Sequence, residues 1–202
     1  MIFPNDEKAM SSVCAGTDFC IAVGLRSENL YSWGLGTYGN LGNGYRKDQD
    51  TPVLFHIMSP VAKVKKQVKQ IACGSRHSMA LTTDGEVYSW GFGRNGRLGH
   101  GSIADFDVPQ RIEAFQVSED KKITEICCGD SHSLARSKDG RVFSWGSGSY
   151  GRLGLGAEND QYAPKTIEAI KHAIGISCNA FHSLAVVNPV GKQVISVSFR
   201  FV

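Results

Sequence analysis

Short segments in which apolar and polar residues alternate recur along the chain, and glycine-rich stretches separate them. Between residues 71 and 112 this pattern predicts four short strands, at 71–74, 79–82, 87–90 and 110–112. The pair Asp84-Gly85 separates the second strand from the third, and Asp-Gly at such a place is typical of a tight hairpin turn. The lysine-rich segment 61–71 comes nearest to a helical period and is compatible with one short helical turn.

The same unit returns at a fixed spacing. Three glycine-rich runs begin at Trp33, Trp90 and Trp145, which are 57 and 55 residues apart. Each run reads Trp-Gly-x-Gly-x-x-Gly-x-Leu-Gly-x-Gly, and together they hold 15 of the 23 glycines. A period of this size marks a repeat architecture, and repeated four-stranded units with glycine-rich connections indicate a β-propeller.

A second motif, Cys-Gly-x-x-His-Ser, precedes the second and third tryptophans. Its histidines are His77 and His132, and a later copy carries His182 but has Asn179 in place of the glycine. Because asparagine tolerates positive φ better than most residues other than glycine, this exchange predicts a backbone requirement at that position. The earliest copy has Phe19 where the others have histidine.

Together, Cys-Gly-x-x-His-Ser-x-Ala, Asp-Gly-x-Val-Tyr/Phe-Ser-Trp and the glycine run resemble the regulator of chromosome condensation repeat, over about 12–187. The resemblance implies a seven-bladed propeller of four-stranded antiparallel blades. At about 55 residues per repeat, 202 residues hold about three to four blades. The expected fold is therefore an incomplete, all-β propeller.

The expected organisation has three parts. An N-terminal extension covers 1–11, and a divergent C-terminal tail covers 188–202, in which Val197 stands at the tryptophan position. The repeats between them are expected at 12–60, 68–115, 123–170 and, in part, 174–187. Six residues are expected to be structural because they recur with the repeat: Trp33, Trp90, Trp145, His77, His132 and His182.

Three chemical interpretations of the motifs are weaker than a structural one. The spacing Gly34-x-Gly36-x-x-Gly39 fits a dinucleotide-binding loop, but no helix is expected to follow it. Pairs such as Cys73 and His77 offer only half of a zinc site. Adjacent His and Ser in a strand point to opposite faces and cannot act as base and nucleophile. We therefore expect no catalytic residue, cofactor or metal.

The informative variation lies at the positions that the glycine runs leave free. Loops at the ends of a propeller carry recognition, and Arg and Tyr are favoured at protein interfaces. The lysines of 63–69 and 121–122 are expected to be solvated. The candidate partner-binding residues are Tyr38, Asn40, Arg94, Arg97, Tyr150 and Arg152.

Composition adds limits on function. The net charge of +3 is too small to indicate nucleic acid by itself. There is neither a long apolar run nor a signal-peptide pattern, so we expect an intracellular protein of the cytoplasm or nucleus, away from membranes. The expected function is a non-enzymatic scaffold that binds a protein and no small-molecule substrate. The resemblance also leaves open nucleotide exchange on a Ran-like small GTPase and chromatin binding. Open blade edges predict self-association.

Overall fold

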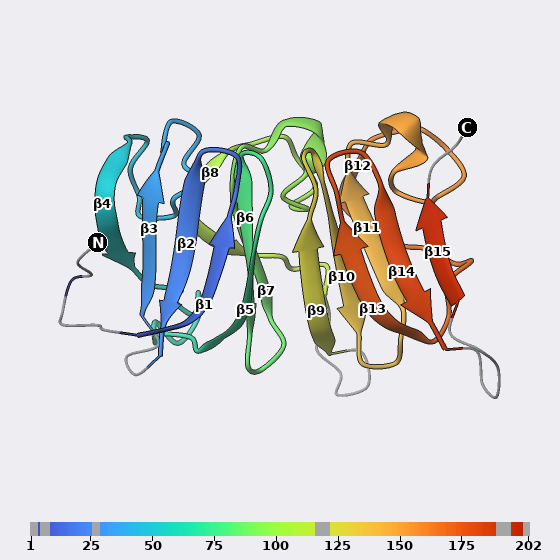
Figure 1. Cartoon of the computed structure of the whole chain (residues 1–202), viewed down its shortest axis with the longest axis horizontal. Helices are drawn as coiled ribbons and strands as arrows, with labels where there is room; N and C mark the ends of the chain where they lie inside the picture. Colours follow the sequence, from blue (N-terminus) through green and yellow to red (C-terminus); the bar gives the residue numbers. More distant parts are fainter. Residues whose placement is uncertain (1–3, 5–8, 26–28, 116–121, 189–194, 200–202) are drawn as a thin grey trace.

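The computed structural model describes residues 4, 9–25, 29–115, 122–188 and 195–199, and they form four antiparallel sheets standing side by side (Figure 1). This confirms an all-β chain with the blade architecture of an incomplete propeller. Blade 1 contains β1 (Met10–Ala15), β2 (Phe19–Gly24), β3 (Leu30–Gly34) and β4 (Gln49–Phe55). Blade 2 contains β5 (Val68–Cys73), β6 (His77–Thr82), β7 (Val87–Gly91) and β8 (Phe106–Arg111). Blade 3 contains β9 (Ile123–Cys128), β10 (His132–Ser137), β11 (Val142–Gly146) and β12 (Gln161–Thr166), and blade 4 contains β13 (Ala173–Cys178), β14 (Ser183–Val187) and β15 (Ile195–Phe199).

Strands follow chain order within each blade, so each blade is a meander. The first strands of neighbouring blades adjoin, β1 with β5, β5 with β9, and β9 with β13. The fourth strands are the opposite edges of their sheets and contain Pro52, Pro109 and Pro164. An edge strand tolerates proline because its missing N–H removes no bond from the interior of the sheet.

The apolar core lies between the blades. In β6, Ala80 packs in a cluster with residues of blade 1, whereas its neighbour Met79 packs in a cluster with residues of blade 3. Successive side chains of a strand point to opposite faces, so a blade enclosed on both sides buries all its positions. All six residues of β6 are accordingly buried. Trp90 and Trp145 are fully buried in two of these inter-blade clusters, whereas Trp33 is partly exposed.

The Asp-Gly turn is confirmed, with Gly85 at φ 87° between β6 and β7. The segment 61–71 contains one turn, closed by the N–H of Lys63 on the carbonyl of Ser59, and then continues into β5. No helix in the described part of the chain is long and apolar enough to cross a membrane.

The expected positive φ in the Cys-Gly-x-x-His motif is wrong. Gly74 and Gly129 are not among the residues with positive φ. A Cβ on Gly74 would lie 2.3 Å from Cε1 of His77 and 2.5 Å from the carbonyl oxygen of Gly129 in the next blade. Glycine stands here because a histidine ring and a neighbouring backbone fill the space that a side chain would need.

The expected equivalence of Val197 with the tryptophans is also wrong. In blades 2 and 3 the tryptophan pairs with the serine of the His-Ser motif, as Trp90 does with Ser78. In blade 4 that serine, Ser183, pairs with Phe199, and Val197 pairs with Ala185. The register therefore places the aromatic position two residues later than alignment of the sequence copies does.

Candidate protein-binding rim

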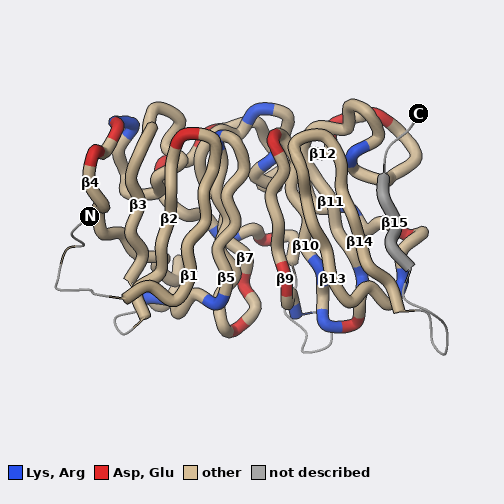
Figure 2. Tube along the Cα trace, in the orientation of Figure 1, with Lys and Arg blue, Asp and Glu red and all other residues tan. Residues whose placement is uncertain are grey.

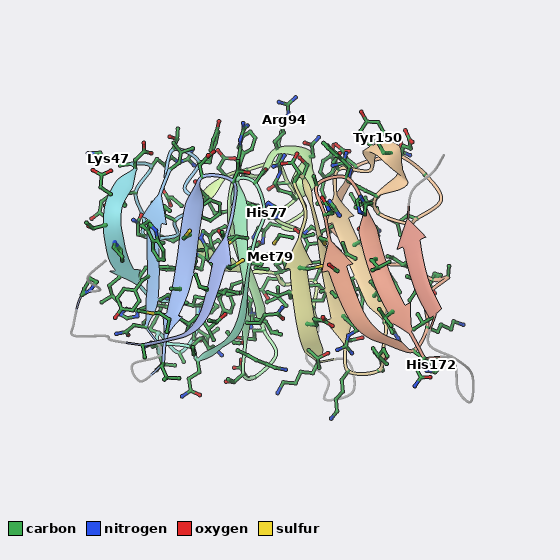
Figure 3. All side chains as sticks on the ribbon, viewed as in Figure 1. Lys47, His77, Met79, Arg94, Tyr150 and His172 are labelled. Atoms are coloured by element: carbon green, nitrogen blue, oxygen red, sulfur yellow. The ribbon has the colours of Figure 1, made fainter. Side chains whose placement is uncertain are left out.

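The glycine runs lie at one end of the strands, which we call the loop rim. It consists of the glycine loops 34–48, 91–105 and 146–160 and the tight turns between the first and second strands of each blade. Backbone bonds join the two kinds of segment, as from Phe92 N to Arg76 O at 2.9 Å. Figure 3 shows Lys47, Arg94 and Tyr150 at this rim and His172 at the opposite one, which we call the turn rim. Lys, Arg, Asp and Glu are prominent in the loops at both rims (Figure 2).

Each glycine loop is closed by an aspartate that sequence reasoning missed. The carboxylates of Asp48, Asp105 and Asp160 accept hydrogen bonds from the backbone N–H groups of Gly36, Gly93 and Gly148 at 2.9, 2.8 and 3.0 Å. These aspartates recur at the same 57- and 55-residue spacing as the tryptophans, so the signal was present in the sequence. They hold the loops in one shape.

The backbone carbonyl before the Leu-Gly of each loop anchors the next blade. The carbonyl of Arg97 accepts from Trp145 Nε1 and from Ser133 Oγ, both at 2.9 Å. The carbonyl of Asn40 accepts in the same way from Trp90 Nε1 at 3.0 Å and Ser78 Oγ at 2.9 Å. Trp90 and Trp145 are thus both buried between blades and held there by a specific hydrogen bond.

Three of the candidate partner-binding residues are buried, which corrects the expectation that their side chains lie on the surface. Asn40, Arg97 and Arg152 are 1%, 4% and 3% exposed. Arg97 donates from Nε to the carbonyl of Arg94 at 2.9 Å and from Nη1 to the carbonyl of Asp130 in blade 3 at 3.1 Å. Long side chains at these loop positions can fold back and replace solvent with backbone acceptors.

Arg152 repeats this arrangement one blade further on, bonding Ser149 O at 2.9 Å and Ala180 O at 3.3 Å. The side chain of Asn40, which is shorter, donates within its own loop, to Leu35 O at 2.7 Å. The other candidates are accessible: Arg94 and Tyr150 are exposed and Tyr38 is half-buried. Among the candidates, Arg94, Tyr150 and Tyr38 are therefore the residues that a partner could contact through their side chains.

The repeated histidines connect blades. His77 Nε2 lies 2.9 Å from Ser133 Oγ, and His132 Nε2 lies 2.9 Å from Ser183 Oγ. Ser133 and Ser183 donate their own protons to the carbonyls of Arg97 and Arg152, so each histidine must be the donor. Burial, aided by the nearby Arg152, lowers the pKa of His132 to about 3, and burial likewise lowers that of His77. Both rings are therefore neutral at pH 7 with the proton on Nε2.

These buried pairs do not form a catalytic site. His77, Ser133, His132 and Ser183 are all 0% exposed, and no substrate can reach them. The glycine loops of blades 2 and 3 each contain a three-residue 3₁₀ turn, at Arg94–Gly96 and Ser149–Gly151. A dinucleotide phosphate needs the N-terminus of a longer helix after such a loop. In the part of the chain that the structure describes, no three His, Cys, Asp or Glu residues are grouped to hold a metal ion.

A hollow of about 530 Å³ opens among the loops of blades 1 to 3 at the loop rim. Three arginines line it, Arg76, Arg94 and Arg97, together with Asp18 and Asp130. Burial lowers the pKa of Arg97 to about 10, which still leaves the guanidinium charged at pH 7. Cationic groups outnumber carboxylates, so the hollow favours an acidic group. Its other lining residues are Thr17, Ser75, Phe92, Asn95, Ser131, Ser147 and Ser149.

An exposed aromatic pair lies beside the hollow. Tyr150 and Phe181 are 61% and 55% exposed and pack edge to face with centroids 6.1 Å apart. The guanidinium of the buried Arg152 lies 5.6 Å and 5.2 Å from these two rings. Arg76 and Phe181 were missed by sequence reasoning. Each is the second x of Cys-Gly-x-x-His or its Asn-containing copy, a free position in the repeat that could have identified them.

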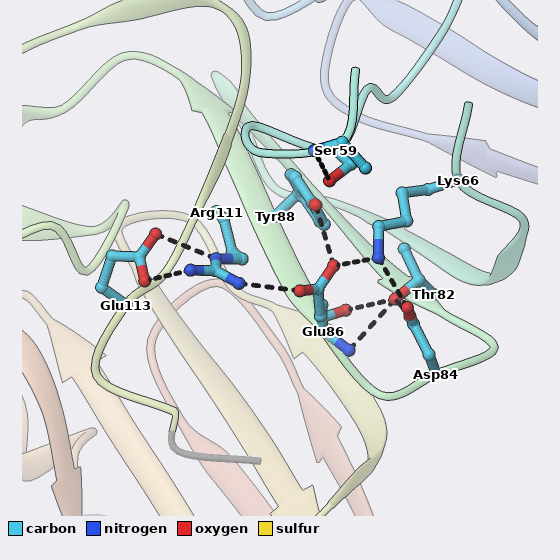
Figure 4. Close-up of polar contacts among 9 residues, drawn as sticks. Ser59, Lys66, Thr82, Asp84, Glu86, Tyr88, Arg111 and Glu113 are labelled. Atoms are coloured by element: carbon cyan, nitrogen blue, oxygen red, sulfur yellow. Dashed lines mark hydrogen bonds and ion pairs between the residues drawn. The ribbon is translucent and has the colours of Figure 1, made fainter. Parts of the chain in front are cut away.

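The turn rim of blade 2 holds a different cluster, which is structural (Figure 4). Glu86 bonds Lys66 at 2.7 Å, Arg111 at 2.8 Å and the hydroxyl of Tyr88 at 3.0 Å. Burial of Glu86 acts to raise its pKa, but the bonds from Lys66 and Arg111 outweigh it and hold that pKa below its usual value. Lys66 is thus paired and largely buried, which corrects its assignment to a solvated lysine cluster.

Comparisons with known proteins agree with this geometry. The family model of the RCC1-like domain matches residues 2–196. The chain belongs to this family of β-propellers, as the resemblance to the regulator of chromosome condensation repeat implies. It is 36% identical over 183 residues to the ultraviolet-B receptor UVR8 of Arabidopsis thaliana, covering 90% of this chain and 40% of the receptor. It is 38% identical over 160 residues to the human E3 ubiquitin-protein ligase HERC2, covering 77% of this chain and 3% of the ligase.

Solved structures share this fold. Human WBSCR16 superposes with a TM-score of 0.75 at 28% identity, over 89% of this chain and 45% of that one. Prp20p of Saccharomyces cerevisiae superposes with a TM-score of 0.71 at 24% identity, over 87% of this chain and 43% of that one. This chain therefore spans less than half the length of the first relatives it matches.

Proposed function

We propose that this chain is a non-enzymatic, intracellular protein-binding module, and that its partner sits on the loop rim. The observation that carries the proposal is the arginine-lined hollow beside the exposed Tyr150–Phe181 pair. Buried aromatic and arginine contacts supply much of the energy of protein interfaces. The loops that carry these residues are held in place here, because Arg97 and Arg152 donate hydrogen bonds to backbone carbonyls of the next blade. A preformed surface lowers the entropy cost of association.

The expected partner presents a carboxylate to Arg76 and Arg94 and an apolar side chain to Tyr150. Arg76 stacks on Tyr38, 4.7 Å from the ring centroid, which orients the guanidinium beside the hollow. Arg94 is exposed and sits in the 3₁₀ turn of its loop. An arginine can bind a carboxylate through two parallel hydrogen bonds, which adds geometric specificity to charge attraction.

Photo-crosslinking from the rim tests this proposal. The photoreactive amino acid p-benzoylphenylalanine is placed at Tyr150 or, as a control, at Val61, which is 84% exposed in the segment between blades 1 and 2 at the turn rim. Crosslinked proteins are then identified by mass spectrometry from cells. We expect discrete adducts from position 150 that disappear with Arg94→Ala and persist with Arg141→Ala at the turn rim. Equal adducts from both positions would contradict the proposal.

Two defined probes separate the more specific alternatives. Prp20p has been studied for binding to Gsp1p and to histones, which supplies both probes. A Ran-type GTPase loaded with a fluorescent guanine nucleotide releases it faster only if this chain has exchange activity. Retention of core histones that Arg94→Ala weakens would instead favour chromatin binding. Neither response, with adducts still present at position 150, leaves the general protein-binding module.

We also propose that blade 4 is covered by a further blade, from this chain's continuation or from a second copy. His182 is exposed, whereas its counterparts His77 and His132 are fully buried against the following blade. Solution mass measured by light scattering tests self-association. A concentration-dependent dimer that His182→Glu weakens would support a second copy as the cover. A monomer at all concentrations would exclude it.

A further inference from the structure

Cysteines meet across two of the three blade interfaces. The last residues of β5, β9 and β13 are Cys73, Cys128 and Cys178. The residues before the last in β1, β5 and β9 are Cys14, Ala72 and Cys127. Adjacent strand positions face opposite sides, so the residue before the last of one blade faces the last residue of the next.

The contacts follow that rule at all three interfaces. Between blades 3 and 4, Cys127 Sγ and Cys178 Sγ are 2.7 Å apart. Between blades 1 and 2, Cys14 Sγ accepts the backbone N–H of Cys73 at 3.0 Å and the two side chains also share a hydrogen bond. Between blades 2 and 3, Cys128 Sγ faces the carbonyl of Ala72 at 3.7 Å, where no second sulfur is present.

We propose that Cys14 with Cys73, and Cys127 with Cys178, are two oxidisable thiol pairs that form disulfide bonds between neighbouring blades. The inner strands of neighbouring blades adjoin, and the two cysteines of each pair are in contact across them. A disulfide needs sulfur atoms about 2.05 Å apart, and the Cys127–Cys178 contact is already close to that distance. These bonds would clamp blade 1 to blade 2 and blade 3 to blade 4.

The oxidant is a peroxide, and the reaction takes place in two steps. The thiolate of one cysteine attacks a peroxide oxygen, so that an S–O bond forms, the O–O bond breaks and water leaves after protonation. The second sulfur then attacks the resulting sulfenic acid, so that the S–S bond forms, the S–O bond breaks and a second water carries away the thiol proton. Two sulfur atoms are each oxidised by one electron, and one peroxide is reduced to two waters.

The surroundings assign the first step to Cys14 in its pair. The hydrogen bond from the Cys73 side chain, followed by its backbone N–H, lowers the pKa of Cys14 to about 7 against the opposing effect of burial. Burial raises the pKa of Cys73. Cys14 is thus the thiolate near neutral pH, and thiolates are the reactive form. Cys14 is itself partly exposed, and a hollow of about 320 Å³ lined by Cys73 and Cys178 lets a small oxidant approach one member of each pair.

Disulfide mapping of the full chain tests the proposal. The reduced protein is treated with hydrogen peroxide at neutral pH, free thiols are blocked with N-ethylmaleimide, and non-reduced peptides are sequenced by mass spectrometry. We expect two links, Cys14–Cys73 and Cys127–Cys178, with Cys20 and Cys128 alkylated. Links between Cys127 and Cys128 or between Cys14 and Cys20, links only between molecules, or six alkylated thiols would overturn the proposal.

Three variants sharpen this result. Cys127→Ser should abolish one link and leave the other, whereas Cys128→Ser should leave both. Ala72→Cys should gain a third inter-blade link, to Cys128, because position 72 is equivalent to Cys14 and Cys127. Ser177→Cys is the matched control, since position 177 lies before the last residue of β13 and faces away from blade 3. A link from position 177 back to Cys127, or no link from position 72, would contradict the geometry.

Thermal unfolding gives a second readout. Each link closes a loop of more than 50 residues, and links of this kind raise the unfolding midpoint of a 200-residue chain by about 5–10 °C. The midpoint should rise on oxidation of the wild type, rise by less in Cys127→Ser and return on reduction. An unchanged midpoint despite complete linkage would show that the links do not clamp the blades.

Discussion

His77 donates a hydrogen bond of 2.9 Å to Ser133, the residue that follows its counterpart His132 in the next blade. The two bonded residues are 56 positions apart in the sequence. The hydroxyl of Ser133 in turn donates a hydrogen bond to the carbonyl of Arg97 at 2.9 Å. The same chain of bonds joins His132, Ser183 and Arg152. The His132-Ser133 motif of blade 3 thus bonds to both neighbouring blades: its histidine donates to Ser183 of blade 4, and its serine accepts from His77 of blade 2.

Replacing His132 with phenylalanine should measure this bond. Phe19 occupies the equivalent place in blade 1, so the ring shape is tolerated there while the donor is lost. We expect His132→Phe to lower the free energy of unfolding by about 1–2 kcal/mol. His132→Ala should cost more, about 3 kcal/mol, because it also leaves a cavity. His182→Phe is the control, and a comparable loss there would argue against the inter-blade bond.

Acid should destabilise the protein before its carboxylates titrate. The pKa of His132 is about 3 in the folded state against an ordinary value of 6.5. Between these values the unfolded chain binds a proton that the folded one does not, so stability falls as pH decreases below 6.5. We expect about 2 kcal/mol to be lost at His132 between pH 7 and pH 5. Denaturant titrations across this range should show a smaller slope for His132→Phe than for the wild type.

Gly74 should not accept even an alanine. Its Cβ would approach the His77 ring to 2.3 Å and the Gly129 carbonyl oxygen to 2.5 Å, and neither group has room to move. We expect Gly74→Ala to cost about 1–3 kcal/mol by overpacking. Gly175→Ala, on the first strand of blade 4, meets nothing within 4 Å and should stay within about 0.5 kcal/mol of the wild type. Equal effects of the two variants in urea unfolding would refute the crowding argument.

Arg97 and Arg94 should separate stability from binding. Arg97→Ala removes bonds to Arg94 O and Asp130 O, and we expect a loss of about 1–3 kcal/mol in unfolding free energy. Arg94→Ala should change stability by less than about 0.5 kcal/mol, because its side chain is exposed, yet should reduce crosslinking from position 150. A stable Arg97→Ala variant, or an unstable Arg94→Ala variant, would reverse the roles assigned to them.

Glu86 should be the most sensitive carboxylate of the turn rim. Glu86→Gln leaves Lys66 and Arg111 with weakened partners in a largely buried cluster, and we expect a loss of about 2 kcal/mol. The folded pKa of Glu86 is depressed, so its contribution is present above the ordinary value of 4.5 and disappears as pH falls through the lower folded value. The difference between wild type and Glu86→Gln should therefore shrink in acid. Glu113→Gln, at a 70% exposed side chain, should cost less than about 0.5 kcal/mol.

The sequence by itself determined the local structure and the architecture. Alternating residues, the Asp84-Gly85 turn and the 57- and 55-residue periods predict strands, hairpins and blades, because these depend on residues close together in the chain. Recurrence also singled out Trp90, Trp145, His77 and His132, which the structure buries between blades, whereas Trp33 is partly exposed and His182 is exposed. The loop rim was predicted as the recognition surface from the free positions of the glycine runs, and that role stays a proposal.

Only the tertiary structure decided which groups face one another between blades. The partner of His77 is 56 residues away, and the burial of Arg97 depends on a carbonyl in the following blade. Gly74 is required by a neighbouring ring and backbone rather than by its own φ, and the meeting of Cys127 with Cys178 depends on how two inner strands adjoin. The period of the sequence identifies the residues that recur within each blade. The packing of one unit against the next depends on the angle and register between sheets, which no single unit contains.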